Sequence, residues 1–261
     1  MNKRVFILIT LSFAVFSCKK TSLTNQHIAM TAMSQKTTST ALQIAPISHA
    51  TAVLTFNNEV VYIDPTGGAA AFSEFAKPTY VVITDIHGDH MDTKTLENLE
   101  LTTTTIIAPK AVAERITTIK ALDIIVIANG EELSFTSFDL EAIPMYNLRE
   151  EALNFHAKGR GNGYVFTINK ERVYFSGDTE GIPEMRTLKN IDKAFVCMNL
   201  PYTMGIESAA NAVLAFRPKQ VFPYHYRGPD GLSAVAKFKE IVNKNDAAIE
   251  VVQWNWYPNR K

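Results

Sequence analysis

Five side chains that can bind a metal ion are crowded into eight residues directly after a short apolar run. The run Tyr80–Thr84 leads into Asp85, His87, Asp89, His90 and Asp92. Such a group seldom belongs to a hydrophobic core, because buried carboxylates and imidazoles need polar partners. Imidazole nitrogens and carboxylate oxygens suit zinc, manganese and iron. The pattern therefore predicts a metal site in a loop at a strand end, although any one of these residues alone could belong to a solvated turn.

Two later apolar runs end in residues of the same chemistry. Arg172–Phe175 leads to Gly177-Asp178-Thr179, and Gln220–Pro223 leads to His225. Metal-binding side chains at the carboxyl ends of neighbouring strands gather along one edge of a sheet. At this edge α/β folds commonly bind small molecules and cofactors. Taken singly, Asp178 could cap a helix and His225 could be a packed surface ring. Taken with the first segment, they predict a single metal-binding edge.

The order and spacing of these motifs resemble the metallo-β-lactamase superfamily, whose first motif is His-x-His-x-Asp-His. Ile63-Asp64-Pro65 and His49-Ala50-Thr51 support the resemblance, which extends from about residue 44 to the end of the chain. Within the superfamily, the chain is most similar to the branch with L-ascorbate-6-phosphate lactonase and N-acyl-phosphatidylethanolamine phospholipase D. The resemblance implies an α/β fold. It is a four-layer αββα sandwich of two mixed sheets flanked by helices, with the metal site at the edge between the sheets.

The resemblance also implies a set of ligands for one or two divalent transition metal ions. Carried over by position, Asp89, His90 and His225 hold one ion, and Asp178 bridges to a second. Zinc is the expected metal, and manganese or iron is also compatible with these ligands. Asp89 and Asp178 are the candidate catalytic residues, because either carboxylate could orient a hydroxide generated between the ions.

The other metal position departs from the family pattern at two places. Asp85 stands where the family has its first histidine, so it either binds metal through oxygen or only orients His87. The middle histidine of the family is replaced by one of two candidates. Asn147 has the expected position at the end of a strand, whereas His156 is the better ligand chemically. We expect a complete site beside a weaker neighbour that is richer in oxygen ligands.

These motifs predict a metal-dependent hydrolase that acts on a phosphodiester, a lactone or a similar ester. No serine nucleophile motif is present, and Cys197 lies within an apolar strand, where a packed thiol is expected. The alternative is a degenerate fold that binds a metal or ligand without catalysis. The altered first and middle ligand positions motivate that alternative.

Two further segments are candidates for binding substrate. The segment His156–Gly163 contains Lys158, Arg160 and three glycines, so its amides and cations could face an anionic small molecule. A mobile hairpin loop is the other interpretation of this segment. His49 is expected either near the site or packed on the surface.

The elements that must position these residues are short strands followed by alternating strands and helices. We expect strands at 52–56, 60–63, 80–84, 105–108, 124–128, 140–145, 164–168, 172–175, 194–198, 220–223 and 249–253. Helices are expected at 110–120, 207–216 and 232–242. The pattern predicts one α/β domain over residues 42–261.

The amino terminus has the features of an export signal. Residues 1–17 combine Lys3 and Arg4 with an apolar run too short to span a membrane, which is typical of a signal peptide. Val15-Phe16-Ser17-Cys18 resembles the lipobox of bacterial lipoproteins, so Cys18 is the expected lipidation site. Simple secretion and an uncleaved anchor are the alternatives. Residues 18–41 are polar and are expected to form a tether. This organisation predicts a lipid-anchored protein of the bacterial cell envelope, facing the periplasm or the exterior.

Overall composition excludes other classes of protein. The 26 basic and 26 acidic residues balance, so nothing indicates nucleic-acid binding. Two cysteines cannot form a disulfide scaffold. The sequence contains no signal for a particular oligomeric state.

Overall fold

The structure is a computed structural model that describes residues 41–258. The predicted signal peptide, the tether up to residue 40 and Cys18 lie outside the described residues. Within them, no helix is long and apolar enough to cross a membrane.

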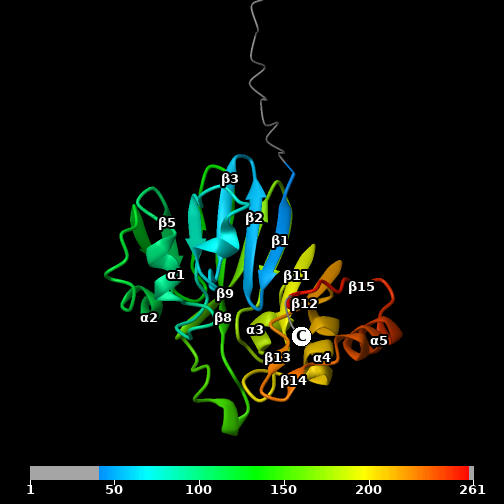
Figure 1. Ribbon diagram of the computed structural model, residues 1–261. Helices are drawn as coiled ribbons and strands as arrows, with labels where there is room; N and C mark the ends of the chain where they lie inside the picture. Colours follow the sequence, from blue (N-terminus) through cyan, green and yellow to red (C-terminus); the bar gives the residue numbers. More distant parts are fainter. Residues whose placement is uncertain (1–40, 259–261) are drawn as a thin grey trace, which may run out of the picture. The chain divides into compact units, whose positions relative to one another are not determined.

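Two mixed β-sheets form the centre of the domain (Figure 1). The first sheet has the strand order β1-β2-β3-β4-β5-β6, with β1 Gln43–Ser48, β2 Thr51–Phe56, β3 Glu59–Ile63, β4 Tyr80–Val82, β5 Thr105–Ala108 and β6 Asp123–Val126. The second has the order β15-β12-β11-β10-β9-β8-β7, with β7 Glu132–Ser134, β8 Asp139–Met145, β9 Gly161–Ile168, β10 Glu171–Phe175, β11 Lys193–Cys197, β12 Gln220–Tyr224 and β15 Glu250–Val251. A separate hairpin joins β13 Arg227–Gly228 to β14 Gly231–Leu232.

Short helices cover the outer faces of both sheets. They are α1 Thr93–Asn98, α2 Lys110–Ala113, α3 Pro183–Arg186, α4 Ile206–Phe216 and α5 Val235–Asn245, with single 3₁₀ turns at Ala69–Phe72 and Glu150–Ala152. In Figure 1, α1 and α2 lie on one side of the strands, and α4 and α5 lie on the other. The four layers confirm the predicted αββα sandwich.

Alternating side chains in the first sheet build two separate cores. In β3, Val61 and Ile63 pack between the sheets, whereas Val60 and Tyr62 face the side of α1 and α2. The β2–β3 turn places Asn57 and Asn58 at positive φ, the backbone that a tight hairpin requires. Burial on both faces explains why these strands read as nearly continuous apolar runs.

The structure corrects several of the expected elements. The helix expected at 110–120 ends after Ala113, and turns continue from there. The helix expected at 232–242 begins at Val235, because Leu232 belongs to β14. β1, α1, β7 and α3 were not predicted, because elements of three to six residues with polar positions have no strong period.

Candidate metal centre

The residues of the candidate site follow the carboxyl ends of strands that run in the same direction. In the first sheet, β1, β3 and β4 share one direction, and in the second sheet β8, β10, β11 and β12 do. The residues that follow these strand ends are His49, Asp64, Asp85–His90, Asn147, Asp178, Asn199 and His225. Parallel strand direction therefore brings residues separated by up to about 175 positions to one edge of the sandwich.

Asp178 lies at the centre of the cluster and is only 2% exposed. It follows β10 at a turn where Gly177 has a φ of 60°. One carboxylate oxygen of Asp178 lies 3.2 Å from His156 Nε2 and 3.4 Å from His90 Nε2. The other oxygen lies 3.4 Å from His225 Nε2. Three imidazoles from three loops therefore surround one buried carboxylate.

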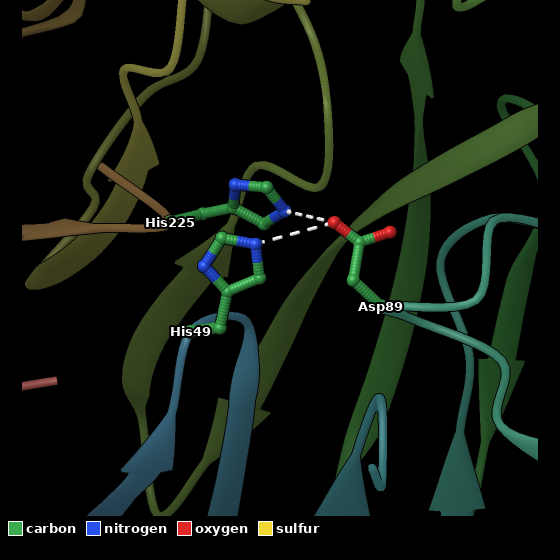
Figure 2. Close-up of side chains that lie close together, drawn as sticks. All are labelled: His49, Asp89 and His225. Carbon is green, nitrogen blue, oxygen red and sulfur yellow. Dashed lines mark hydrogen bonds and ion pairs between the residues drawn. The ribbon is translucent and has the colours of Figure 1, made fainter. Parts of the chain in front are cut away.

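Asp89 reaches the same group of imidazoles from the solvent side. Its side chain is 44% exposed, and one oxygen lies 3.3 Å from His225 Nε2 and 3.2 Å from His49 Nε2. Figure 2 shows both rings directed at this one oxygen, while the other carboxylate oxygen points away from them. The two rings lie with centroids 3.8 Å apart. The structure thus places His49 beside Asp89 and not on a remote surface.

His156 and Asn147 have different positions relative to this cluster. His156 Nε2 faces Asp178, and its Nδ1 lies 3.2 Å from the carbonyl oxygen of Tyr202. The Asn147 amide nitrogen donates to the carbonyl oxygens of Tyr202, at 2.7 Å, and Ala152, at 2.9 Å. Asn147 therefore lies behind His156 and supports it, while His156 presents a ring nitrogen to the site.

We expect replacement of Asn147 by aspartate to weaken metal binding about 10- to 100-fold, as is usual for a group that supports a ligand. The carboxylate cannot donate to the carbonyls of Tyr202 and Ala152, so the loop that carries His156 loses its support. Competition with a fluorescent chelator measures the effect. Tighter binding in Asn147→Asp would contradict this geometry, because it would mean that residue 147 reaches the metal.

Asp85 is engaged by an arginine and a histidine. Its carboxylate receives two hydrogen bonds from Arg160, at 3.1 and 3.0 Å, and lies 2.7 Å from His87 Nδ1. Burial opposes the charged form of Asp85, but these partners, the hydrogen bond of His87 first, lower the pKa of Asp85. The contacts favour the role in which Asp85 orients His87, because both oxygens are already occupied. Asp92, in the same loop, caps α1 by accepting from the amide of Lys94 at 3.0 Å.

Asp64 is a supporting residue whose role was not predicted from its motif. It is fully buried, and it accepts hydrogen bonds from the amide and hydroxyl of Thr84, at 2.8 and 2.6 Å. The same carboxylate lies 2.8 Å from His90 Nδ1. With Nδ1–H donating to Asp64, Nε2 is the nitrogen of His90 that faces the cluster and would bind a metal after losing its proton. A lone aspartate after a strand was the only sequence signal for this role.

The electrostatics of the cluster favour ionised carboxylates. Burial would raise the pKa of Asp178, but the charges of His225 and His90 outweigh it and hold this pKa well below its usual range. Burial would also raise the pKa of Asp89, but its hydrogen bonds with His225 and His49 outweigh burial and lower this pKa. Burial lowers the pKa of His49 to about 4, so this ring is neutral at neutral pH. Ionised carboxylates beside the neutral ring of His49 are suited to binding a cation.

The glycine-containing segment has a structural role that differs from the expected one. Lys158 extends to Glu184, at 3.2 Å, and its side chain is mostly exposed. Arg160 forms an ion pair with Asp85. A Cβ atom on Gly163 would lie 2.7 Å from the carbonyl oxygen of Ser176, so this glycine allows β9 to pack closely. Both cations of this segment are therefore paired within the protein, and the binding of an anion by Lys158 and the glycine amides stays a prediction.

Two cavities open onto the cluster. One, of about 270 Å³, is lined by His87, Asp89, Phe155, His156, Asp178, Asn199 and Tyr202. The other, of about 320 Å³, is lined by His49, Asp89, Asn199, Tyr202, Arg227, Gly228 and Pro229. A larger cavity of about 480 Å³ lies beside α1 and contains none of the clustered residues, so volume alone does not identify the site.

The donor atoms of the cluster fit a divalent transition metal. Within residues 41–258, Asp178 Oδ1 and His156 Nε2 are buried without a hydrogen-bond partner. His90 Nε2 and His225 Nε2 face each other at 3.1 Å. Three groups of residues each have ligand atoms within 4.8 Å of one another, and the first and last share His225: His49, Asp89 and His225; Asp85, His87 and His156; and His90, Asp178 and His225. Buried nitrogen and oxygen atoms that lack hydrogen-bond partners are expected where a cation completes the site.

Comparison with known proteins identifies relatives with the same fold. Residues 61–226 match the family model of the Beta-lactamase superfamily domain. A UPF0173 metal-dependent hydrolase of Symbiobacterium thermophilum is 29% identical over 71% of this chain and 84% of its own. The crystal structure of a candidate metal-dependent hydrolase from Parabacteroides distasonis is 36% identical and has a TM-score of 0.73, covering 81% of this chain and 92% of that one. A metallo hydrolase from Ignicoccus hospitalis, 21% identical with a TM-score of 0.69 over 82% and 95% of the two chains, has the same fold.

Proposed function

Because the chain belongs to the metallo-β-lactamase superfamily and is a metal-dependent hydrolase, we propose that it hydrolyses a phosphodiester, a lactone or a similar ester. The observation that carries this proposal is the buried carboxylate of Asp178, with three imidazoles around it, at the wall of an open cavity. The similarity of the motifs to the lactonase and phospholipase D branch supports these two substrate classes.

Two sets of residues would hold the metal ions. Asp89, His90 and His225 would form one set and His87 and His156 the other, and Asp178 contacts histidines of both sets. Zinc suits these ligands best, and manganese or iron is compatible with them. When bound, such ions act as Lewis acids and lower the pKa of water toward neutrality, which supplies a nucleophile.

The protein's own residues position the reactants. Asp89 is the half-exposed carboxylate of the cluster, so it can accept a hydrogen bond from the attacking water while His49 and His225 fix one of its oxygens. His87, whose side chain is 39% exposed, also lines this cavity, where an oxygen of the substrate can approach. These contacts align water and substrate, which is the proximity contribution to catalysis.

Attack by water agrees with the state of the only cysteine in the described residues. Cys197 is buried, and its sulfur lies 3.3 Å from the carbonyl oxygen of Thr179. Burial raises the pKa of Cys197 to about 11, so the reactive thiolate is scarce at neutral pH.

The matched variants Asp89→Asn and Asp92→Asn test the function. Both remove one carboxylate charge from the same loop, but Asp92 only caps α1. With protein loaded with zinc or manganese, we expect Asp89→Asn and His90→Ala to reduce hydrolysis of bis(4-nitrophenyl) phosphate and of γ-thiobutyrolactone at least about 100-fold. Asp92→Asn is expected to cost little stability and little activity, because asparagine caps a helix about as well as aspartate.

Full activity in Asp89→Asn and in His90→Ala would show that the proposed residues are not the site. Stoichiometric metal without turnover of any ester in the wild type would instead support the non-catalytic, metal-binding alternative. Elemental analysis of the same preparations distinguishes these two outcomes.

We propose that the enzyme is held at the surface of the cell envelope through lipidated Cys18. The short apolar segment and the lipobox-like residues before Cys18 support this location. In cell fractionation, wild-type protein should sediment with membranes and Cys18→Ser should become soluble or remain as an unprocessed precursor. Equal membrane association and equal processing of both forms would contradict the lipid anchor.

A further inference from the structure

Arg227 is a cation beside the metal-binding cluster, and no carboxylate of residues 41–258 lies within ion-pair distance of it. It belongs to β13 and comes two residues after His225. By contrast, Arg149 is paired with Glu180, and Arg160 is paired with Asp85. The guanidinium of Arg227 lies 5.8 Å from the centre of the Tyr257 ring and its side chain is exposed. A cation held over an aromatic face retains its hydrogen-bond donors for an external anion.

Arg227 lies in a cleft that includes the catalytic cavity. The cavities of about 270 and 320 Å³ share Asp89, Asn199 and Tyr202 as wall residues. His87 and His156 line only the first cavity, whereas His49 and Arg227 line only the second. A substrate bound at Asp89 and Asp178 can therefore extend past Asp89 toward Arg227.

The walls around Arg227 are fixed by contacts with the site. Tyr257, under the guanidinium, has its hydroxyl 2.7 Å from His49 Nδ1. A Cβ atom on Gly228 would overlap the carbonyl oxygen of Leu200, so the hairpin packs directly on the Asn199–Thr203 loop. Ser233 also donates to the carbonyl oxygen of Met198 at 2.5 Å. The position of the Arg227 backbone is therefore coupled to the ligand loops, which favours a preorganised subsite.

We propose that Arg227 forms a subsite for an oxyanion group of the substrate, a carboxylate or a phosphate, remote from the bond that is hydrolysed. This inference rests on the proposed function, because it assigns a second contact to the same substrate. The planar fork of arginine matches both oxyanions with two parallel hydrogen bonds. The exposed end of the cleft is where such a charged group can enter without losing all of its hydration.

Equilibrium binding to the metal-loaded, full-length protein tests the subsite directly. Succinate and inorganic phosphate are titrated by calorimetry into wild type, Arg227→Gln and Arg115→Gln. Arg115 is exposed and does not line the cleft, so Arg115→Gln removes the same charge elsewhere. We expect Arg227→Gln to raise the Kd of at least one anion about tenfold, and Arg115→Gln to change neither more than about twofold. The anion with the larger loss identifies the carboxylate or phosphate preference.

Arg227→Lys distinguishes charge recognition from support of the Tyr257 wall. It retains the cation but not the planar fork, so we expect it to recover only part of the lost binding. A Kd within twofold of wild type for both anions in Arg227→Gln would overturn the subsite. A loss in Arg227→Lys equal to that in Arg227→Gln would also count against it.

Turnover measurements keep this inference separate from the proposed function. We expect Arg227→Gln to lower kcat/KM for 4-nitrophenyl hemisuccinate about tenfold relative to 4-nitrophenyl butyrate, mainly through KM. If the wild type cleaves neither ester nor any phosphodiester or lactone, the proposed function fails. The calorimetric result then still decides whether Arg227 binds oxyanions.

Discussion

Replacement of Asp178 by asparagine is expected to reduce kcat/KM about a thousandfold and to lower the metal content of the purified protein. The loss should exceed the 10- to 100-fold effect typical of groups that only support a ligand. Within residues 41–258, Asp178 is the one carboxylate whose two oxygens approach His90, His156 and His225. Asparagine keeps the shape but removes the charge that draws these imidazoles and the metal ions together.

The measurement pairs steady-state kinetics with elemental analysis of the same preparation. Thermal unfolding serves as the control for folding, because the side chain is buried and its environment is polar. A variant that folds, retains all of its metal and loses activity less than tenfold would contradict the central position of Asp178. Metal loss without unfolding is the expected result.

Among the predicted substitutions, replacement of Asp64 by alanine is expected to lower the free energy of unfolding the most. In Asp64→Ala, the amide and hydroxyl of Thr84 and Nδ1 of His90 lose a fully buried acceptor at 2.6 to 2.8 Å. Removal of one partner from a buried, charged network typically costs about 3–5 kcal/mol. We therefore expect a decrease of this size in the free energy of unfolding, measured with urea.

Asp64→Asn separates stability from metal affinity. Asparagine can still accept from the Thr84 amide, but its own amide nitrogen would donate to Nδ1 of His90. The proton of His90 would then reside on Nε2, the nitrogen that faces Asp178 and His225. We expect this variant to unfold less readily than Asp64→Ala and yet to bind zinc about 10- to 100-fold more weakly than wild type. Wild-type zinc affinity in Asp64→Asn would contradict the proposed tautomer of His90.

Much of the fold and the positions of the main ligands could be predicted from local pattern. Apolar runs of four to six residues indicated most of the strands, because strands buried on both faces have nearly continuous apolar sequence. The polar residues at 85–90, 178 and 225 stood out because each follows such a run directly. The helix expected at 110–120 was wrong beyond Ala113, since the proline before it indicates where a helix begins but not where it ends.

The sequence by itself determined which strand ends carry metal-binding chemistry and that the chain folds as an α/β sandwich. Tertiary structure alone decided that His156 faces Asp178 while Asn147 supports it, and that Arg160 is paired with Asp85 and not free for an anion. These contacts join loops that are tens of residues apart in sequence. Their geometry depends on how the two sheets pack against each other, which the local pattern of one segment does not specify.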